Sequence, residues 1–234
     1  MDIRSVARKM GINPLPFSGQ AIFVMVLHAV LTDIAWRLST VDQFMEKDPE
    51  QDALFEMFGY ATLVAILGLS ALFWVLGRRQ AFRRTIVVYM SIGTLALLFN
   101  CMNLVETLGL RSNETGGAFA LLGDAAITWA TNVLNFAILY WFLDQGGPDR
   151  RGSAEPGRPD LAFPQQTTDL PGWNGWKPGI LDYVFVAFNT STAFSPTDTT
   201  VLSHRAKILC MVQAGISLII IAMLAGRVVN MLGT

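Results

Sequence analysis

The sequence predicts an all-α integral membrane protein of about five transmembrane helices, with one further short helix that enters the membrane without crossing it. Hydrophobic residues make up 52% of the 234-residue chain and charged residues only 15%, whereas soluble domains carry about 25% charged residues. A helix that spans a bilayer needs roughly 20 mostly apolar residues. The segments that qualify are residues 20–38, 54–77, 85–109, 118–143 and 204–231.

The first apolar segment, residues 20–38, follows a basic N-terminus, as the apolar part of a secretory signal would. It contains His28 and Asp33, however, and ends at Trp36-Arg37 without a small-residue cleavage site, so we interpret it as a span. An ionisable residue inside a span is a candidate for function because burying a charge in lipid is costly. We expect a multi-pass protein of the plasma membrane, which in bacteria is the inner membrane.

The connection between the second and third spans, "GRRQAFRR" (Gly77–Arg84), carries four arginines. Because Lys and Arg are enriched in short cytoplasmic loops, we expect this loop and the N-terminus on the cytoplasmic side. Strict alternation of the spans then places the chain from Asp144 to about Lys207 on the same side. Residues 1–112 form an N-terminal three-span region.

Polar residues interrupt the third, fourth and last spans. Asn100 and Glu106 lie in the third span, and Arg227 in the last is expected to reach the interface or to pair with an acid. The fourth span carries polar residues spaced so that they fall on one helical face, namely Asp124, Thr128, Thr131, Asn132 and Asn135. They either hold helices together by hydrogen bonds or line a pore or proton path, and the sequence leaves both readings open.

The second half of the chain, residues 113–234, contains the span at 118–143 and a long connector at 145–178. Gly and Pro are dense in the connector, which argues against a regular helix or strand through its middle. We expect an exposed loop whose end, with Trp173 and Trp176, lies at the membrane surface, where aromatic residues are enriched.

After the connector, the apolar run from Ile180 to Phe188 is too short to cross a core of about 30 Å as a helix. The polar stretch "NTSTAFSPTDTT" follows it, and the final span, residues 204–231, begins soon after. Irregular backbone at membrane depth survives only where protein or a water-filled cavity surrounds it. The pattern therefore predicts a re-entrant helix and loop over residues 180–199, with Thr200 or Ser203 as the N-cap of the last span.

The stretch "LDYVFVAFNTSTAFSPTD" resembles the pore helix and selectivity filter of the potassium-channel superfamily, whose pattern runs roughly F-T-T-x-T-T-V-G-Y-G-D. The resemblance covers about residues 119–231, and the "LD-GG-…-FP" connector is also similar to that of bacterial multi-pass membrane proteins. It implies that Thr190 and Thr192 lead into a filter closed by Asp198, and that Gly215 lies near a gating hinge. The remaining filter positions then fall on Phe194, Ser195, Pro196 and Thr197.

This chain departs from the family where selectivity is set, because potassium selectivity depends on carbonyl rings of a T-V-G-Y-G segment. Ser195, Pro196 and Thr197 replace the glycine-containing part, and proline fixes φ near −65°. The resemblance therefore implies a pore-loop fold without potassium selectivity. It also implies entry of the loop from the outside, opposite to the side that the arginines favour.

The function that we expect is passive permeation of inorganic cations through a homotetramer, because one pore loop cannot enclose a path. Hydroxyls and carbonyls of the loop would line the path, and Asp198 would add a ring of negative charge at one mouth. Alternatives are a secondary transporter, for which His28 is the one titratable residue plainly at mid-depth, and a non-conducting protein that keeps the same fold. In the latter, the Ser/Thr cluster only caps helices or forms a ligand site.

Other classes of function find no support in the sequence. A net charge of −1 gives no reason for a nucleic-acid partner, and no Ser-His-Asp set, zinc signature, P-loop or dinucleotide fingerprint indicates an enzyme. The chain has two histidines and two cysteines. Cys101 and Cys210 lie in apolar segments without metal-binding spacing, so we expect buried thiols, no metal and no cofactor. The lipid bilayer is the expected partner.

Overall fold

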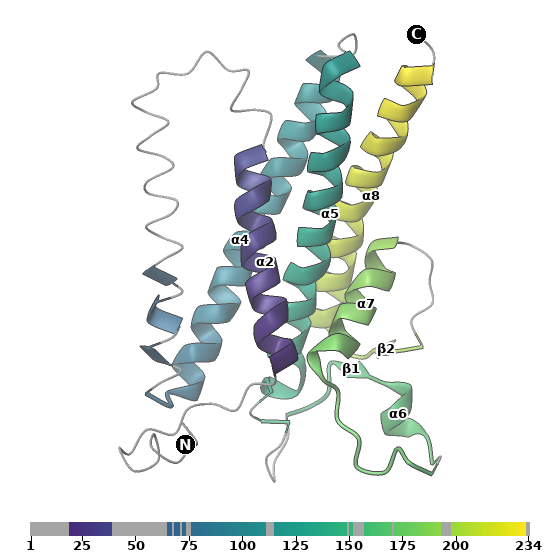
Figure 1. The fold of residues 1–234 in the computed structure, drawn as a ribbon. Coiled ribbons are helices and arrows are strands. Elements are labelled where there is room, and N and C mark those ends of the chain that lie inside the picture. Colours follow the sequence, from purple (N-terminus) through teal and green to yellow (C-terminus); the bar gives the residue numbers. More distant parts are fainter. Residues whose placement is uncertain are drawn as a thin grey trace.

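The computed structural model describes residues 19–38, 65–66, 68–70, 72–73, 76–110, 115–148, 150–151, 157–169, 171–192 and 198–232. The protein is mostly helical (Figure 1). Its long helices are α2 (Gly19–Leu38), α4 (Arg79–Leu110), α5 (Thr115–Leu143) and α8 (His204–Leu232). The shorter elements are η2 (Asp144–Gly146), β1 (Leu161–Ala162), α6 (Pro164–Thr167), α7 (Ile180–Thr192) and β2 (Thr200–Val201).

Within the described residues, three helices are long and apolar enough to cross a membrane. Their spanning parts are Gln80–Met102, Ala125–Gly146 and His204–Gly226, while the apolar part of α2, Phe23–Ile34, is shorter. The helices predicted over residues 20–38, 85–109, 118–143 and 204–231 are present with similar bounds. The span expected over residues 54–77 falls mainly outside the described residues.

Helix α5 is the centre of the bundle and contacts α2, α4, α7 and α8. Every residue from 131 to 142 is buried, as expected for a helix with other helices on several sides. The helix ends at Leu143, just before the sequence "QGGP", in which Gly146 and Gly147 adopt φ of 79° and 101°. Only glycine adopts such values at little cost, so the chain leaves the helix here and enters the connector.

The arginine-rich segment is not the loop that the sequence predicted, because residues 79–84 already belong to α4. Its place in the bundle is nevertheless informative. The Arg83 guanidinium donates a hydrogen bond to the Gly146 carbonyl. The start of α4 and the start of the connector therefore lie at the same end of the molecule, as alternation of the spans predicts (Figure 1).

The expectation that the connector is an exposed loop is wrong for its middle. Strand β1 pairs antiparallel with β2, so that Leu161 lies opposite Val201. Leu161 is 1% exposed and Phe163 is 3% exposed, and the Phe163 ring packs edge-on against Tyr183 at 5.2 Å. Two-residue strands leave no periodic pattern, which explains why the sequence did not reveal them.

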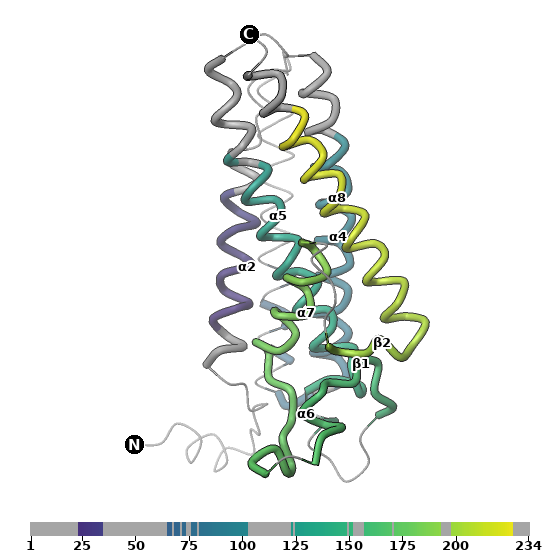
Figure 2. The backbone as a smooth tube through the Cα atoms, turned by 90° about the vertical axis from the view of Figure 1, so that its right-hand side faces the viewer, coloured from purple at the N-terminus to yellow at the C-terminus, as the bar shows by residue number. Residues whose placement is uncertain are grey.

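Helix α7 begins at the connector end and runs beside α5 and α8 into the bundle (Figures 1 and 2). Ser191, near its end, is hydrogen-bonded to Gln213 of α8. Gln213 lies nine residues after His204, so at 1.5 Å per residue the end of α7 is about 14 Å along α8. The chain then returns to β2, beside β1 at the end where α7 began.

Candidate functional site

The polar end of α7 presents the two predicted threonines that the structure describes. The Thr190 hydroxyl donates to the Val186 carbonyl at 2.8 Å, and the Thr192 hydroxyl donates to the Phe188 carbonyl at 3.1 Å. Both bonds reach back one turn in the same helix, and each hydroxyl oxygen keeps lone pairs for another donor or a cation. Asp198 is exposed where the chain returns. The filter-like residues Phe194, Ser195, Pro196 and Thr197 lie outside the described residues.

Gln213 holds the end of α7 in place from α8. Its amide nitrogen donates to the Ala187 carbonyl at 2.7 Å and to the Ser191 hydroxyl at 2.8 Å. Its amide oxygen accepts a bond of 2.6 Å from the Tyr140 hydroxyl of α5. Gln213 is 0% exposed and Ser191 is 1% exposed, so these bonds form away from water. One side chain thus joins three helices at the level where α7 ends.

Asn132 of α5 continues this network along α8. Its amide nitrogen donates to the Ser217 hydroxyl at 2.8 Å and lies 3.4 Å from the Gln213 carbonyl. Gly215, the predicted hinge, lies between these two positions of α8 and would meet nothing within 4 Å if it carried a Cβ. The helix on both sides of Gly215 is therefore fastened to α5, while the glycine itself faces open space.

A second polar cluster lies where the connector meets the base of α7. The Tyr183 hydroxyl donates to the Asp144 carboxylate at 2.6 Å, and the Arg151 guanidinium donates to the Tyr183 oxygen at 2.8 Å. Arg151 also lies over the Tyr183 ring, 5.0 Å from its centre. Burial raises the pKa of Tyr183, so the phenol keeps its proton and donates it to Asp144. The backbone N–H of Asp160 donates to the same carboxylate at 2.7 Å.

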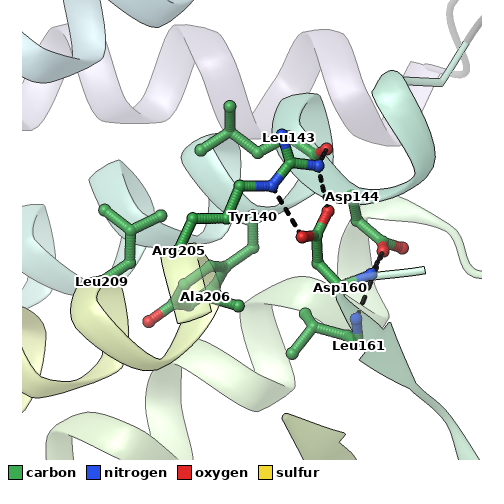
Figure 3. A pocket seen from close by; sticks show the side chains of 8 residues that line it. All are labelled: Tyr140, Leu143, Asp144, Asp160, Leu161, Arg205, Ala206 and Leu209. Atoms are coloured by element: carbon green, nitrogen blue, oxygen red, sulfur yellow. Dashed lines mark hydrogen bonds and ion pairs between the residues drawn. The ribbon is translucent and has the colours of Figure 1, made fainter. Parts of the chain in front are cut away.

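Arg205 and Asp160 join the start of α8 to β1 (Figure 3). The Arg205 Nε and Nη2 atoms lie 2.6 and 2.5 Å from the two oxygens of Asp160, which is a bidentate pair. The guanidinium also donates to the Leu143 carbonyl at 3.0 Å. Two residues earlier, the Ser203 hydroxyl accepts a bond of 3.2 Å from the N–H of Ala206, which confirms Ser203 as the N-cap of α8. The start of the last helix is thus fixed to both β1 and the end of α5.

The polar residues predicted inside the spans form hydrogen bonds across two different helix pairs, α4 with α5 and α5 with α8. Asn100 of α4 donates to Thr128 at 3.2 Å, and Asn135 donates to Thr94 of α4 at 2.9 Å, whereas Asn132 faces α8. These are hydrogen bonds between helices, as the packing interpretation expects.

Two further predicted polar residues lie on α2. His28 is buried and Asp33 half-buried on α2. The side chains of Glu106, Asp124 and Arg227 lie outside the described part of the structure.

Sequence reasoning missed most of the residues that hold the site together. A glutamine in the middle of the last apolar span was a usable signal for Gln213, because buried amides need partners. No local signal pointed to Tyr183, Arg151 or Asp144, since their partners are far away in the chain. Among the described residues, no group of three His, Cys, Asp or Glu side chains could hold a metal ion.

Comparison of the chain with protein-family models, with curated proteins and with solved structures gives no match. The features that bear on function are therefore the geometry of α7, its polar end and the side chains that support it.

Proposed function

We propose that this protein is a subunit of an oligomeric channel that conducts cations passively through a path lined by the Ser/Thr-rich loop after α7. The observation that carries the proposal is the depth at which α7 ends. Gln213 and Ser191 join that end to α8 about 14 Å from the start of the helix. In a bilayer whose core begins near His204, this would correspond to the middle of a hydrocarbon core of about 30 Å. We take the protein to be a multi-pass protein of the plasma membrane with about five spans, as composition indicates.

The chemistry at the end of α7 favours cations. The last carbonyls of a helix lack partners within the helix and carry a partial negative charge. Thr190 and Thr192 add hydroxyl oxygens at the same level, with lone pairs still available. Oxygens of this kind replace the hydration shell of a cation in known filters. Asp198, exposed where the chain returns, adds negative charge at the entrance.

The path requires several copies of the chain. One loop per subunit lines only part of a channel, so we propose a symmetric homotetramer. The outer face of α7 fits such an assembly, because Leu181, Phe185 and Phe188 are 52%, 59% and 47% exposed in the single chain. Apolar side chains at this depth suit contact with lipid or with a neighbouring subunit.

The loop would enter from the cytoplasmic side. The Arg83–Gly146 hydrogen bond ties the arginine-rich start of α4 to the end from which α7 enters the bundle. Arginines of short loops favour the cytoplasmic side. This orientation is opposite to that of the potassium-channel superfamily.

A second candidate function, a non-conducting membrane protein with the same fold, is favoured by one observation. The hydroxyls of Thr190 and Thr192 donate to their own helix, as residues that only complete the end of a helix would do. In that case the loop stabilises α7 and passes no ions.

Replacement of Asp198 by asparagine separates the two candidates. We expect purified protein in liposomes to pass small cations, and the D198N variant to show a lower preference for cations over anions, read as a shift in reversal potential. The matched control is D169N, because Asp169 is an exposed acid in the connector and is not part of the loop after α7. Equal reversal potentials for D198N and D169N would remove the proposed role of Asp198. A reconstituted wild type without flux under any condition would favour the second candidate.

A further inference from the structure

A second group of buried polar side chains lies between α2, α4 and α5, and the proposed channel does not use it. We define the His28 cluster as His28, Tyr89, Asn135 and Thr131, the last of which lies one turn before Asn135 on α5; these residues are 2%, 9%, 0% and 4% exposed. His28 is the tenth residue of the twenty in α2 and therefore lies at the middle of that helix. The His28 and Tyr89 rings meet edge-on with their centres 6.1 Å apart.

The His28 cluster contains polar atoms without partners. Both imidazole nitrogens of His28 lack a hydrogen-bond partner among the described residues, as do Tyr89 Oη, Thr131 Oγ1 and Asn135 Oδ1. The Asn135 side chain lies near the His28 ring, but the two side chains do not meet the geometry of a hydrogen bond. Buried polar atoms in folded proteins are nearly always paired, with protein or with water.

The network around Gln213 provides the contrast within the same molecule. There the Gln213 amide oxygen accepts a bond from Tyr140, and the amide nitrogen donates to Ala187 and to Ser191. Protein groups alone satisfy the Gln213 side chain, although the Asn132 Oδ1 atom nearby has no partner among the described residues. In the His28 cluster the Asn135 amide nitrogen donates to Thr94. The Asn135 amide oxygen lies against Gly93, and a Cβ on Gly93 would come within 2.8 Å of it.

We propose that the His28 cluster binds water inside each subunit and forms a hydrated, proton-exchanging site separate from the loop. The cluster consists of an imidazole, a phenol, a hydroxyl and an amide, and each of these groups has a neutral form. The site therefore suits a neutral molecule that both donates and accepts hydrogen bonds. A neutral imidazole has one donor and one acceptor, and a phenol and a threonine hydroxyl each have both. Buried water typically makes about three bonds to such groups. Water in contact with His28 exchanges protons with the imidazole.

Nuclear magnetic resonance of the two histidines tests the proposal directly. His204 is exposed at the start of α8, so the H204Q variant leaves His28 as the single histidine of the chain. The full chain, labelled with ¹⁵N-histidine and reconstituted in lipid bilayers, is examined for magnetisation transfer from water protons to the imidazole nitrogens. We expect clear transfer, and replacement of the imidazole N–H by deuterium without unfolding. Absence of transfer together with a retained N–H in deuterated water would overturn the proposal.

A matched pair of variants locates the water. Y89F removes the free hydroxyl and keeps the ring against His28, whereas Y140F removes a hydroxyl that belongs to the Gln213 network. Combined with H204Q, Y89F should weaken the transfer to His28 and Y140F should leave it unchanged. Equal effects of the two variants would contradict a site built by the His28 cluster. If Y89F does not fold, the H204Q measurement still decides the proposal.

Discussion

Gln213 connects three helices because a primary amide both donates and accepts hydrogen bonds. It receives the Tyr140 hydroxyl of α5 and donates twice to α7. A leucine of similar size would fit the space but would leave Tyr140 and Ser191 without this partner. The position of the end of α7 therefore depends on one side chain that interrupts an otherwise apolar helix.

The Q213L variant should lower the free energy of unfolding. Hydrogen bonds between helices in membranes average about 0.6 kcal/mol, so the loss of three predicts about 2 kcal/mol. Thermal or denaturant unfolding in detergent measures the difference. The control is M211L, because Met211 is 66% exposed on the same helix. A Q213L variant as stable as M211L would show that packing alone holds α7.

The two-residue strands β1 and β2 hold the connector against the start of α8 because side-chain contacts reinforce their pairing. The β1–β2 pair is short, but Arg205 binds Asp160 through both carboxylate oxygens and also donates to the Leu143 carbonyl. Asp160 is 6% exposed at its side chain while Arg205 is 55% exposed. The exposure of Arg205 weakens the pair through solvent screening, whereas the buried carboxylate keeps its need for a partner.

The D160N variant should loosen the connection between β1, β2 and the start of α8. Asparagine cannot accept the bidentate pair, so we expect a loss of about 1 kcal/mol, near the lower end for a charged hydrogen bond because of the screening at Arg205. Hydrogen–deuterium exchange of residues 161–163 and 200–202 measures the effect. K207Q is the control, since Lys207 is exposed on the same turn. Unchanged exchange in D160N would mean that backbone pairing suffices.

At the scale of the whole molecule, the exposed apolar faces of α7 and α8 define what a bilayer or a second copy must cover. Phe185 is 59% exposed on α7, and Met211 and Leu218 are 66% and 67% exposed on α8. Aqueous exposure of so much apolar surface would be unfavourable. Three helices of spanning length agree with a location in lipid.

The proposed channel predicts a tetramer that survives extraction. Native mass measurement of the detergent-solubilised protein, with bound detergent and lipid accounted for, should give four copies. The same stoichiometry should appear in lipid nanodiscs, where detergent cannot disperse the subunits. A monomer or dimer in nanodiscs would leave no shared central path and would contradict the pore, although the water site at His28 would be unaffected because it lies within one chain.

Much of the fold could be read from the sequence because helix formation and membrane depth depend on local composition. The bounds of α2, α5 and α8 agree with the predicted segments to within a few residues, and α7 was expected because its apolar run is too short to span. Of the two N-caps predicted for the last helix, Thr200 and Ser203, the structure shows Ser203. Of the candidate site, Thr190, Thr192 and Asp198 could be named from their residue types, whereas the supports of α7 could not.

The sequence by itself determined where the long helices α2, α5 and α8 lie, which segments are apolar enough for lipid and where the polar end of α7 begins, because each depends on neighbours in the chain. The tertiary structure alone decided that the connector folds against α7 and α8 and that Gln213 fixes the end of α7. It also decided that His28 meets Tyr89. Asn132 and Ser217 are 85 residues apart, and Tyr140 and Gln213 are 73 apart. Pairings over such distances leave no periodic signal in the chain and arise only when the helices pack.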